Sequence, residues 1–340
     1  MFRFKARQHK IAVKFLFVIC NSIVLVLIII GKLKLFKKSI SFHRQYREYS
    51  GGHQKVCDYI HHTIASDFFT PFLFLENTSN VQKQLFNNIQ GLEYSPEYLP
   101  KLADVAFLAG MDWQAYQPFF DPKQVKVNLV QHVRHADKNY PLFQFLQHKA
   151  IRLCVSDAVK DAIEPFANGP CFTIKMGHEI PKISRLKRFD LYILATKQPK
   201  LGQLLFEWAT NRGLRVLLHD KTTERELVYQ AMAESVVALP LPNKTEGFFL
   251  PGIEAMVLAD WAVVPDCIAS REYSLGKANI SSCELNREAC QIAIEDAFKR
   301  VKSWKCLVNK WHGRRLSANY SPVQERNSYQ SILNNVDTIW

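Results

Sequence analysis

Short apolar runs alternate with longer amphipathic stretches along most of the chain. Runs of about four to eight apolar residues predict buried strands, and longer stretches with apolar positions three and four apart predict helices. The strands are expected at residues 39–43, 70–75, 104–109, 125–130, 151–156, 171–175, 190–195, 214–219, 235–239 and 261–265. Because strand, helix and strand in this order form crossover units of a parallel sheet, the pattern predicts an α/β fold.

Helix signals stand between these runs. Helices are expected after the turn at Gly51-Gly52, through about residue 62, and at residues 156–166, 201–212, 224–233, 284–302 and 325–336; another opens at Pro251. A proline at the first helical position loses no hydrogen bond. Ser156 is a suitable N-cap, and Thr223 with Glu226 three residues later reads as a capping box.

The N-terminal residues 1–38 differ from the rest of the chain. Residues 15–31 are apolar apart from Asn21 and Ser22, with basic residues on both sides. About 17 helical residues span about 25 Å, the short end of a transmembrane helix. Three interpretations stay open: a membrane anchor, a basic helix lying in the plane of the membrane, or an upstream extension that is not part of the native protein.

Composition narrows the classes of partner. The 340 residues are 48% hydrophobic and 22% charged, as in globular proteins. The net charge of +13 predicts attraction to anions: nucleic acid, an acidic membrane surface or phosphorylated substrates. No nucleic-acid-binding motif accompanies the charge, so no nucleic-acid partner is expected. The eight cysteines include no C-x-x-C pair and no metal-ligand spacing, which favours reduced thiols in a cytosolic domain without a metal.

The candidate chemistry centres on residues 240–266. Glu246 is expected in a loop at the carboxyl end of a strand, where open α/β sheets bind ligands. Glu254 is expected in the first turn of the next helix, so both carboxylates could face one crevice. Between them, the backbone N–H groups that lead into the helix form a ready anion site; they belong to Gly247, Phe248, Phe249 and Leu250.

The order Glu-Gly-Phe-x-Leu-Pro-x-x-Glu-Ala-Met, followed by Val-Val-Pro-Asp-Cys, resembles the donor-site signature of retaining nucleotide-sugar glycosyltransferases of family 4. The resemblance is specific near 240–267 and extends over about residues 39–335. It implies a GT-B fold, with two Rossmann-like domains facing a central cleft. It also implies transfer with retention of anomeric configuration, without a metal or any cofactor besides the nucleotide sugar.

This resemblance assigns the parts of the chain. Residues 39–180 would form the acceptor-side domain and residues 181–316 the domain that binds the donor. The basic, proline-marked segment 181–188 is the linker between them. Residues 317–340 would form a C-terminal helix that packs back on the first domain.

The resemblance also assigns roles to side chains. Glu246 would hold sugar hydroxyls and Glu254 the ribose hydroxyls, while His132, at the end of a strand, would lie beside the transferred sugar. Lys197 and Lys200 stand in a predicted strand-to-helix loop, which suits a diphosphate. The family has an arginine and a later lysine there, so the division of labour between the two lysines stays open. Glu246, Lys197 and His132 are the predicted catalytic residues.

On the acceptor side, Gly51 and Gly52 match the place of a glycine-rich loop that borders acceptor and donor phosphates; a plain tight turn is the alternative. Arg134 or His135 would meet an acceptor phosphate, unless the cluster is only a hydrogen-bonded loop. The chain departs from the family at Met176, where an asparagine is usual. It departs again in the turn with Ala269, where relatives often have Gly-Asn-Arg.

The expected partners are a nucleotide-sugar donor, a glycan or lipid-linked acceptor and a membrane surface. Since nucleotide sugars are cytosolic, the catalytic part should be cytoplasmic, anchored or not through residues 15–31. Two rival hypotheses remain. One is an inactive GT-B-like protein that binds a sugar or phosphate, favoured by the departures and opposed by the intact Glu246 and Glu254. The other is a membrane scaffold that binds no donor.

Overall fold

The computed structural model describes residues 37–47, 50–76, 84–183, 185–274 and 276–340. The predicted apolar segment 15–31 lies outside these residues. Among the helices of the described part, none is long and apolar enough to cross a membrane. The chain divides into two compact units, one that ends at Ala106 and one that begins at Phe107. The predicted domain boundaries at residues 180 and 316 stay a prediction.

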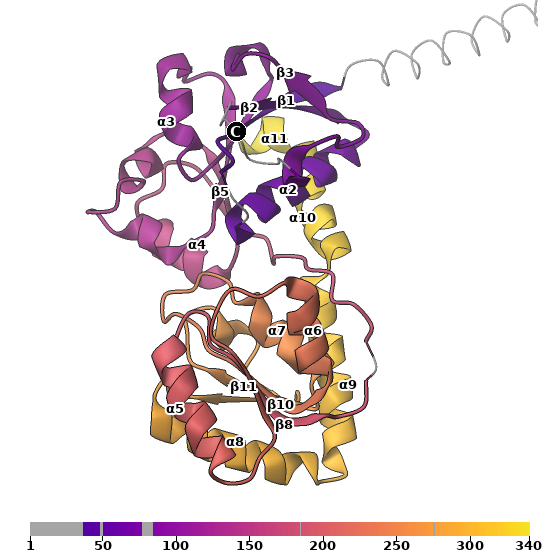
Figure 1. The fold of residues 1–340 in the computed structure, drawn as a ribbon. Coiled ribbons are helices and arrows are strands. Elements are labelled where there is room, and N and C mark those ends of the chain that lie inside the picture. The colour runs from indigo at the N-terminus through magenta and orange to yellow at the C-terminus, as the bar shows by residue number, and fades with distance from the viewer. Residues whose placement is uncertain (1–36, 48–49, 77–83, 184, 275) are drawn as a thin grey trace, which may run out of the picture. The chain divides into compact units, whose positions relative to one another are not determined.

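Two parallel sheets form the framework, which confirms the predicted α/β class (Figure 1). The first sheet has seven strands in the order β3-β2-β1-β4-β5-β6-β7. Its strands are β1 (Lys38–Arg44), β2 (Phe69–Leu75), β3 (Glu93–Ser95), β4 (Val105–Ala109), β5 (Val125–Val130), β6 (Ile151–Cys154) and β7 (Cys171–Thr173). The hydrophobic pattern missed β3 because Glu-Tyr-Ser is not an apolar run.

The second sheet has five strands in the order β12-β11-β10-β8-β9, and each neighbouring pair is parallel. They are β8 (Phe189–Leu194), β9 (Val216–His219), β10 (Ser235–Pro240), β11 (Trp261–Pro265) and β12 (Ile280–Cys283). The chain winds to one side of β8 for β9, then to the other side for β10 to β12. In open α/β sheets, the ligand crevice lies outside the carboxyl ends of the strands at such a reversal.

Helices cover both faces of the second sheet, because alternate residues of each strand point to opposite sides. On one face Tyr192 packs in a cluster with Met256 of α7 and with residues of α6. On the other face Ile193 packs with Leu205 of α5 and Ile294 of α8. Strands buried on both faces read as continuous apolar runs, which is why the pattern predicted them.

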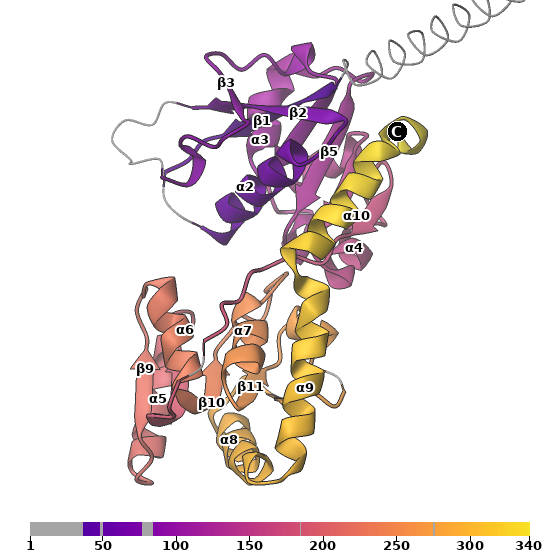
Figure 2. The ribbon, with the colours of Figure 1, turned by 90° about the vertical axis from the view of Figure 1, so that its right-hand side faces the viewer.

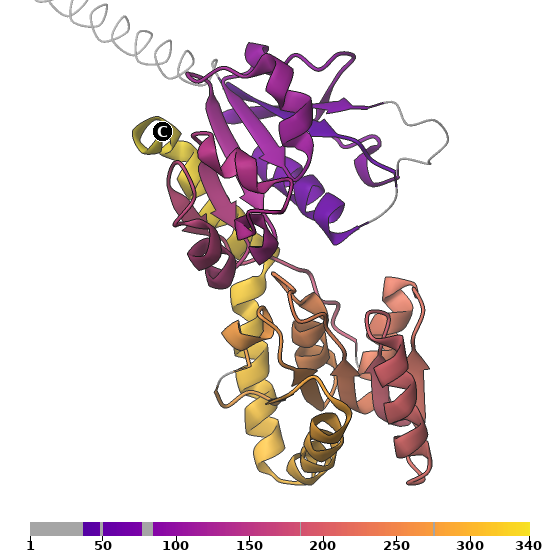
Figure 3. The same ribbon diagram turned by 90° about the vertical axis from the view of Figure 1, so that its left-hand side faces the viewer.

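The α-helices of the described residues are α2 (Gly51–Ile64), α3 (Asp112–Tyr116), α4 (Asp157–Ile163), α5 (Pro199–Thr210), α6 (Arg225–Ala233), α7 (Leu250–Leu258), α8 (Arg287–Val301), α9 (Lys305–Ser317), α10 (Pro322–Asn334) and α11 (Val336–Ile339). Their order along the second half of the chain can be followed in Figures 2 and 3. Helix α5 begins two residues before the predicted start, so Lys200 lies in its first turn.

The predicted capping box at Thr223 is wrong. Helix α6 begins at Arg225 after Glu224, with no side-chain cap. The Thr223 hydroxyl donates backwards to the Lys221 carbonyl oxygen, 3.0 Å away, instead of accepting from the helix. Threonine hydroxyls make such local backbone bonds readily, which competes with capping.

The C-terminal helices are held by close contacts within the second unit. The Tyr329 ring of α10 is buried and lies edge-on to Phe107, with ring centroids 6.3 Å apart. A Cβ at Gly177 would lie 2.6 Å from the Cα of Pro322, so only glycine lets the chain pass the start of α10 here. The next residue, His178, donates its backbone N–H to the Tyr320 carbonyl oxygen (2.8 Å).

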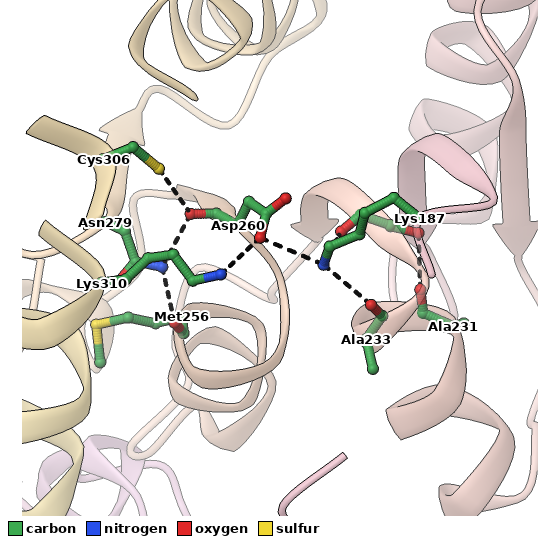
Figure 4. A network of polar contacts seen from close by, with 9 residues as sticks. Lys187, Ala231, Ala233, Met256, Asp260, Asn279, Cys306 and Lys310 are labelled. Atoms are coloured by element: carbon green, nitrogen blue, oxygen red, sulfur yellow. Dashed lines mark hydrogen bonds and ion pairs between the residues drawn. The ribbon is translucent and has the colours of Figure 1, made fainter. Parts of the chain in front are cut away.

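The predicted linker carries no helix or strand in its described residues and is anchored near its end by Lys187. The Lys187 ammonium donates to the carbonyl oxygens of Ala233 and Ser235, both at 2.9 Å. It also lies 3.5 Å from the Asp260 carboxylate, which Lys310 of α9 contacts at 2.6 Å (Figure 4). Asp260 therefore joins the linker to α9, and burial lowers the pKa of Lys187.

We expect Asp260→Ala to lower the free energy of unfolding by about 1–2 kcal/mol, because it leaves two neighbouring ammonium groups without their carboxylate. Lys310→Ala should cost less, since Asp260 keeps Lys187 as a partner. Urea unfolding of both variants measures the difference. An equal or smaller cost for Asp260→Ala would show that the carboxylate does not hold this network together.

Candidate functional site

Lys197 and Glu246 meet where the strand order of the second sheet reverses. Lys197 follows β8 and Glu246 follows β10, and these strands are neighbours. The Lys197 Nζ donates to Glu246 Oε1 at 2.6 Å. The Glu246 side chain is 11% exposed and that of Lys197 37% exposed, so the ammonium can still reach a ligand from solvent. The structure thus brings together the predicted carboxylate and one predicted lysine.

The loop after β10 also touches the end of β5. A Cβ at Gly247 would lie 2.2 Å from the Gln131 carbonyl oxygen and 3.2 Å from the His132 Cα. The first distance is shorter than a Cβ tolerates and the second is tight, so the close approach requires glycine. His132 is therefore held beside the Glu246 loop, and the structure brings the three predicted catalytic residues into one cluster.

Electrostatics keep the His132 imidazole neutral near neutral pH. Burial lowers its pKa most, and the charge of Arg134 lowers it further. The Lys197 charge acts in the same direction and the Glu246 charge in the opposite direction, which agrees with the proximity of all three groups. A neutral imidazole can accept or donate a hydrogen bond without adding a positive charge.

Tyr273 holds the segment from Phe249 into the start of α7 in place. Its hydroxyl donates to the Phe249 carbonyl oxygen (2.8 Å), and a Cβ at Gly252 would lie 2.3 Å from that hydroxyl. Phe249 is buried, and its ring faces the Lys197 ammonium at 5.4 Å. Phe248 packs on Tyr320, with centroids 5.7 Å apart. Tyr273 thereby supports the predicted donor-binding loop through Leu250, where α7 begins.

Glu254 is buried on α7, and three polar side chains approach one of its two oxygens. Oε1 lies 2.8 Å from His178 Nε2, 3.3 Å from the Tyr229 hydroxyl and 3.5 Å from the Arg225 guanidinium. Among the residues that the structure describes, none donates a hydrogen bond to Oε2. One carboxylate oxygen is thus tied to the protein, and the second keeps its capacity to accept.

His178, Arg225 and Tyr229 are the residues that the sequence reasoning missed. In the sequence, the segment 176–179 is marked only by Met176, where the family usually has an asparagine, yet its His178 lies 2.8 Å from Glu254 Oε1. Arg225 and Tyr229, four residues apart on α6, reach the same imidazole at 2.7 Å and 2.8 Å. Burial raises the pKa of Tyr229 and the nearby Glu254 charge raises it further, so the phenol stays protonated. The one feature of the sequence that could have indicated these contacts is the pair Gly177-His178, which follows the last strand predicted in the first half of the chain.

Other predicted residues stand apart from this cluster. Lys200 is exposed in the first turn of α5 and makes no ion pair or hydrogen bond with another described residue. Gly51 and Gly52 form the first turn of α2, capped by Ser50, rather than a loop before it. A Cβ at Gly51 would meet nothing within 4 Å. The roles of these three residues stay predictions.

Arg134 and His135 differ in access to solvent. Both lie on a short 3₁₀ helix, Val133–Ala136. Arg134 is exposed, with its guanidinium 5.1 Å from the centre of the Tyr140 ring. His135 is buried, and burial is the main cause that lowers its pKa to about 3. Of the two, Arg134 is the side chain that can present a charge to an anion.

The turn after β11 carries one contact that the sequence did not indicate. The Asp157 backbone N–H, at the start of α4, donates to Glu272 Oε1 at 2.8 Å. Burial raises the pKa of Glu272. In the same turn, Arg271 pairs with Asp266 at 2.6 Å. In the described part of the chain, no three His, Cys, Asp or Glu side chains are grouped to hold a metal ion.

Comparison by sequence finds no match, either among protein-family models or among curated proteins. Comparison by structure does find similar folds. HepE of Anabaena, solved with UDP, covers 87% of this chain and 99% of its own length at a TM-score of 0.65 and 12% identity. HepE solved with UDP-glucose gives a TM-score of 0.64 and 13% identity over the same shares.

Two further structures extend the range of activities. Sucrose-phosphate synthase of Thermosynechococcus elongatus covers 89% of this chain and 100% of its own, with a TM-score of 0.64 and 10% identity. A putative UDP-N-acetylglucosamine 2-epimerase of Listeria monocytogenes covers 88% and 96%, with a TM-score of 0.58 and 10% identity. These similarities establish the GT-B type of fold for this chain.

The cluster predicts how the His132 pKa responds to its neighbours. Lys197→Ala should raise this pKa, because a positive charge nearby is lost, and Glu246→Gln should lower it, because a negative charge is lost. An NMR titration of the His132 ring, assigned with a His132→Gln variant, measures both shifts. Two variants that leave the His132 titration unchanged would show that the three groups are not neighbours in solution.

Proposed function

We propose that this chain is a glycosyltransferase of the family 4 type, which moves a sugar from a nucleotide-sugar donor to an acceptor with retention of anomeric configuration. The observation that carries the proposal is the Lys197–Glu246 contact of 2.6 Å at the strand reversal of the second sheet. The GT-B type of fold supports it, as does HepE, whose structures contain UDP or UDP-glucose. The donor is therefore proposed to be a uridine or related nucleotide sugar.

Departure of the nucleoside diphosphate builds negative charge on the leaving group. The Lys197 ammonium is the cation proposed to stabilise it, together with the backbone N–H groups after Gly247 at the start of α7. Lys200 in the first turn of α5 adds a more distant positive charge. Because Lys197 also contacts Glu246, donor phosphate and carboxylate would share one ammonium. Glu246 is then held close to the reacting sugar, where its carboxylate would accept from sugar hydroxyls.

Glu254 is proposed to bind the ribose of the donor. Its Oε1 is already engaged by His178, Tyr229 and Arg225, which fixes the orientation of the carboxylate. Oε2 is the oxygen that would accept from the ribose hydroxyls. A carboxylate that is already oriented to accept a hydrogen bond contributes to donor affinity, because little conformational entropy is lost on binding.

The remaining assignments complete the proposal. The neutral His132 would donate to or accept from the transferred sugar, and Arg134 would meet a phosphate on a glycan or lipid-linked acceptor. Gly51 and Gly52 would border the acceptor. No metal and no further cofactor take part, and the catalytic part is proposed to be cytoplasmic, as its nucleotide-sugar donor requires.

The fold alone leaves other activities open, because the Listeria protein with a similar fold is described as an epimerase. An epimerase changes the sugar without needing an acceptor. An inactive relative would bind the nucleotide and release no diphosphate. Release of UDP or GDP from a panel of nucleotide sugars, with and without candidate acceptors, identifies a transferase. Analysis of the sugar that stays on the nucleotide then separates an epimerase from an inactive relative.

With an active donor in hand, Glu246→Gln and Lys197→Ala should each lower kcat at least about tenfold, since each removes an interaction that is strongest in the transition state. Steady-state kinetics of purified variants give the measurement. Glu288→Gln and Lys123→Ala are controls, because both parent residues are exposed and neither forms an ion pair or hydrogen bond with Lys197 or Glu246. Near-normal turnover in both site variants would refute these roles, and loss in the controls would indicate damage to the fold.

A further inference from the structure

Helix α9 carries large apolar side chains on its outward face. Trp304, Leu307, Val308 and Trp311 are 75%, 76%, 47% and 56% exposed, respectively. Their spacing of three, one and three residues places them on one side of the helix. The opposite side is buried at Cys306 and Gly313, so α9 packs on the protein there. Figure 2 shows α9 beside α7 at the edge of the second sheet.

This arrangement is unusual for a helix on the surface of a globular protein. Such helices turn polar residues outward and keep apolar residues for the core. Scattered exposed apolar residues need no explanation, but a contiguous group that includes two tryptophans marks an interaction site. Two of the six tryptophans of the chain lie in this group.

Positive charges surround the group, and α9 itself has no acidic residue. The Lys305 ammonium lies 6.0 Å from the centre of the Trp304 ring, and the Arg315 guanidinium 5.6 Å from that of Trp311. Further exposed cations are Lys299, Lys302 and Arg314. On the neighbouring α8, Glu295 and Asp296 are paired with Arg212 and Arg300, so their charges are already compensated.

We propose that the outward face of α9 docks on an anionic lipid surface. Tryptophan is enriched where apolar and polar layers meet, and lysine and arginine hold their charges at the headgroups while their alkyl stems lie against apolar groups. Binding of this kind draws on both apolar burial and attraction to anionic lipids. Lys305 and Arg315, which lie near the two tryptophan rings, and the further exposed cations supply the second contribution.

A second copy of the chain is a poorer match for the same face. A symmetric dimer through α9 would place the same patch on both subunits. Lys305, Arg314 and Arg315 of one copy would then approach the same cations of the other, and like charges across an interface cost binding energy. Charge complementarity therefore favours the lipid surface.

The test uses the full chain and vesicles of phosphatidylcholine with or without phosphatidylglycerol. We expect binding to the mixed vesicles only, and Trp304→Ser/Trp311→Ser should weaken it about tenfold because apolar burial is lost. Brominated phosphatidylcholine in the vesicles should quench the tryptophan fluorescence of the wild type. The double variant should lose most of this quenching, even if residues 1–36 also bind lipid.

A matched pair of single variants controls for general hydrophobicity. Leu307 of α9 and Leu102, outside α9, are both 76% exposed. Leu307→Ser should weaken vesicle binding and Leu102→Ser should not, while thermal unfolding stays unchanged in both. Equal quenching in wild type and double variant would overturn the proposal. So would equal binding to vesicles with and without phosphatidylglycerol. A concentration-dependent dimer that the same α9 substitutions abolish would assign the face to a second copy instead.

Discussion

The Lys197 ammonium and the Glu246 carboxylate are in contact because the order of the strands brings their two loops together. Parallel strands end at the same edge of a sheet, and β8 and β10 are neighbours although 40 residues lie between Leu194 and Ser235. Their following loops therefore meet, and one bears an ammonium while the other bears a carboxylate.

Glycine at position 247 carries this constraint one step further. Because it has no side chain, the Glu246 loop reaches the end of β5 and lies against Gln131 and His132. The groups proposed to act on phosphate, sugar hydroxyls and the transferred sugar thereby occupy one region. A larger residue at 247 would push the loop away from His132 without changing any of the proposed catalytic side chains. The arrangement of the site therefore depends on the backbone at Gly247 as well as on those side chains.

The sequence predicted the strands of the second sheet well, because residues such as Tyr192 and Ile193 are buried on opposite faces and leave a continuous apolar run. It failed where local signals are weak. Strand β3 is three residues long, and the apolar residues of α9 point outward rather than into a core. Thr223 carried a capping signal, but its hydroxyl bonds to the Lys221 carbonyl oxygen instead.

Some residues of the candidate site could be predicted from the sequence, and others could not. Glu246, Lys197 and Glu254 could be found because each stands at a strand end or helix start that the pattern predicts. The partners of Glu254 could not, since His178 follows a three-residue strand and Arg225 lies 29 residues before Glu254. Contacts of this kind arise from tertiary packing, so the spacing of residues in one sequence does not predict them.

The proposed function requires that a nucleotide diphosphate binds at the strand reversal of the second sheet. A crystal structure with UDP or UDP-glucose tests it most directly. We expect the diphosphate within hydrogen-bond distance of Lys197 and the N–H groups at the start of α7, and the ribose on Glu254 Oε2. A nucleotide bound away from Lys197 and Glu254, or no bound nucleotide at saturating concentration, would contradict the claim.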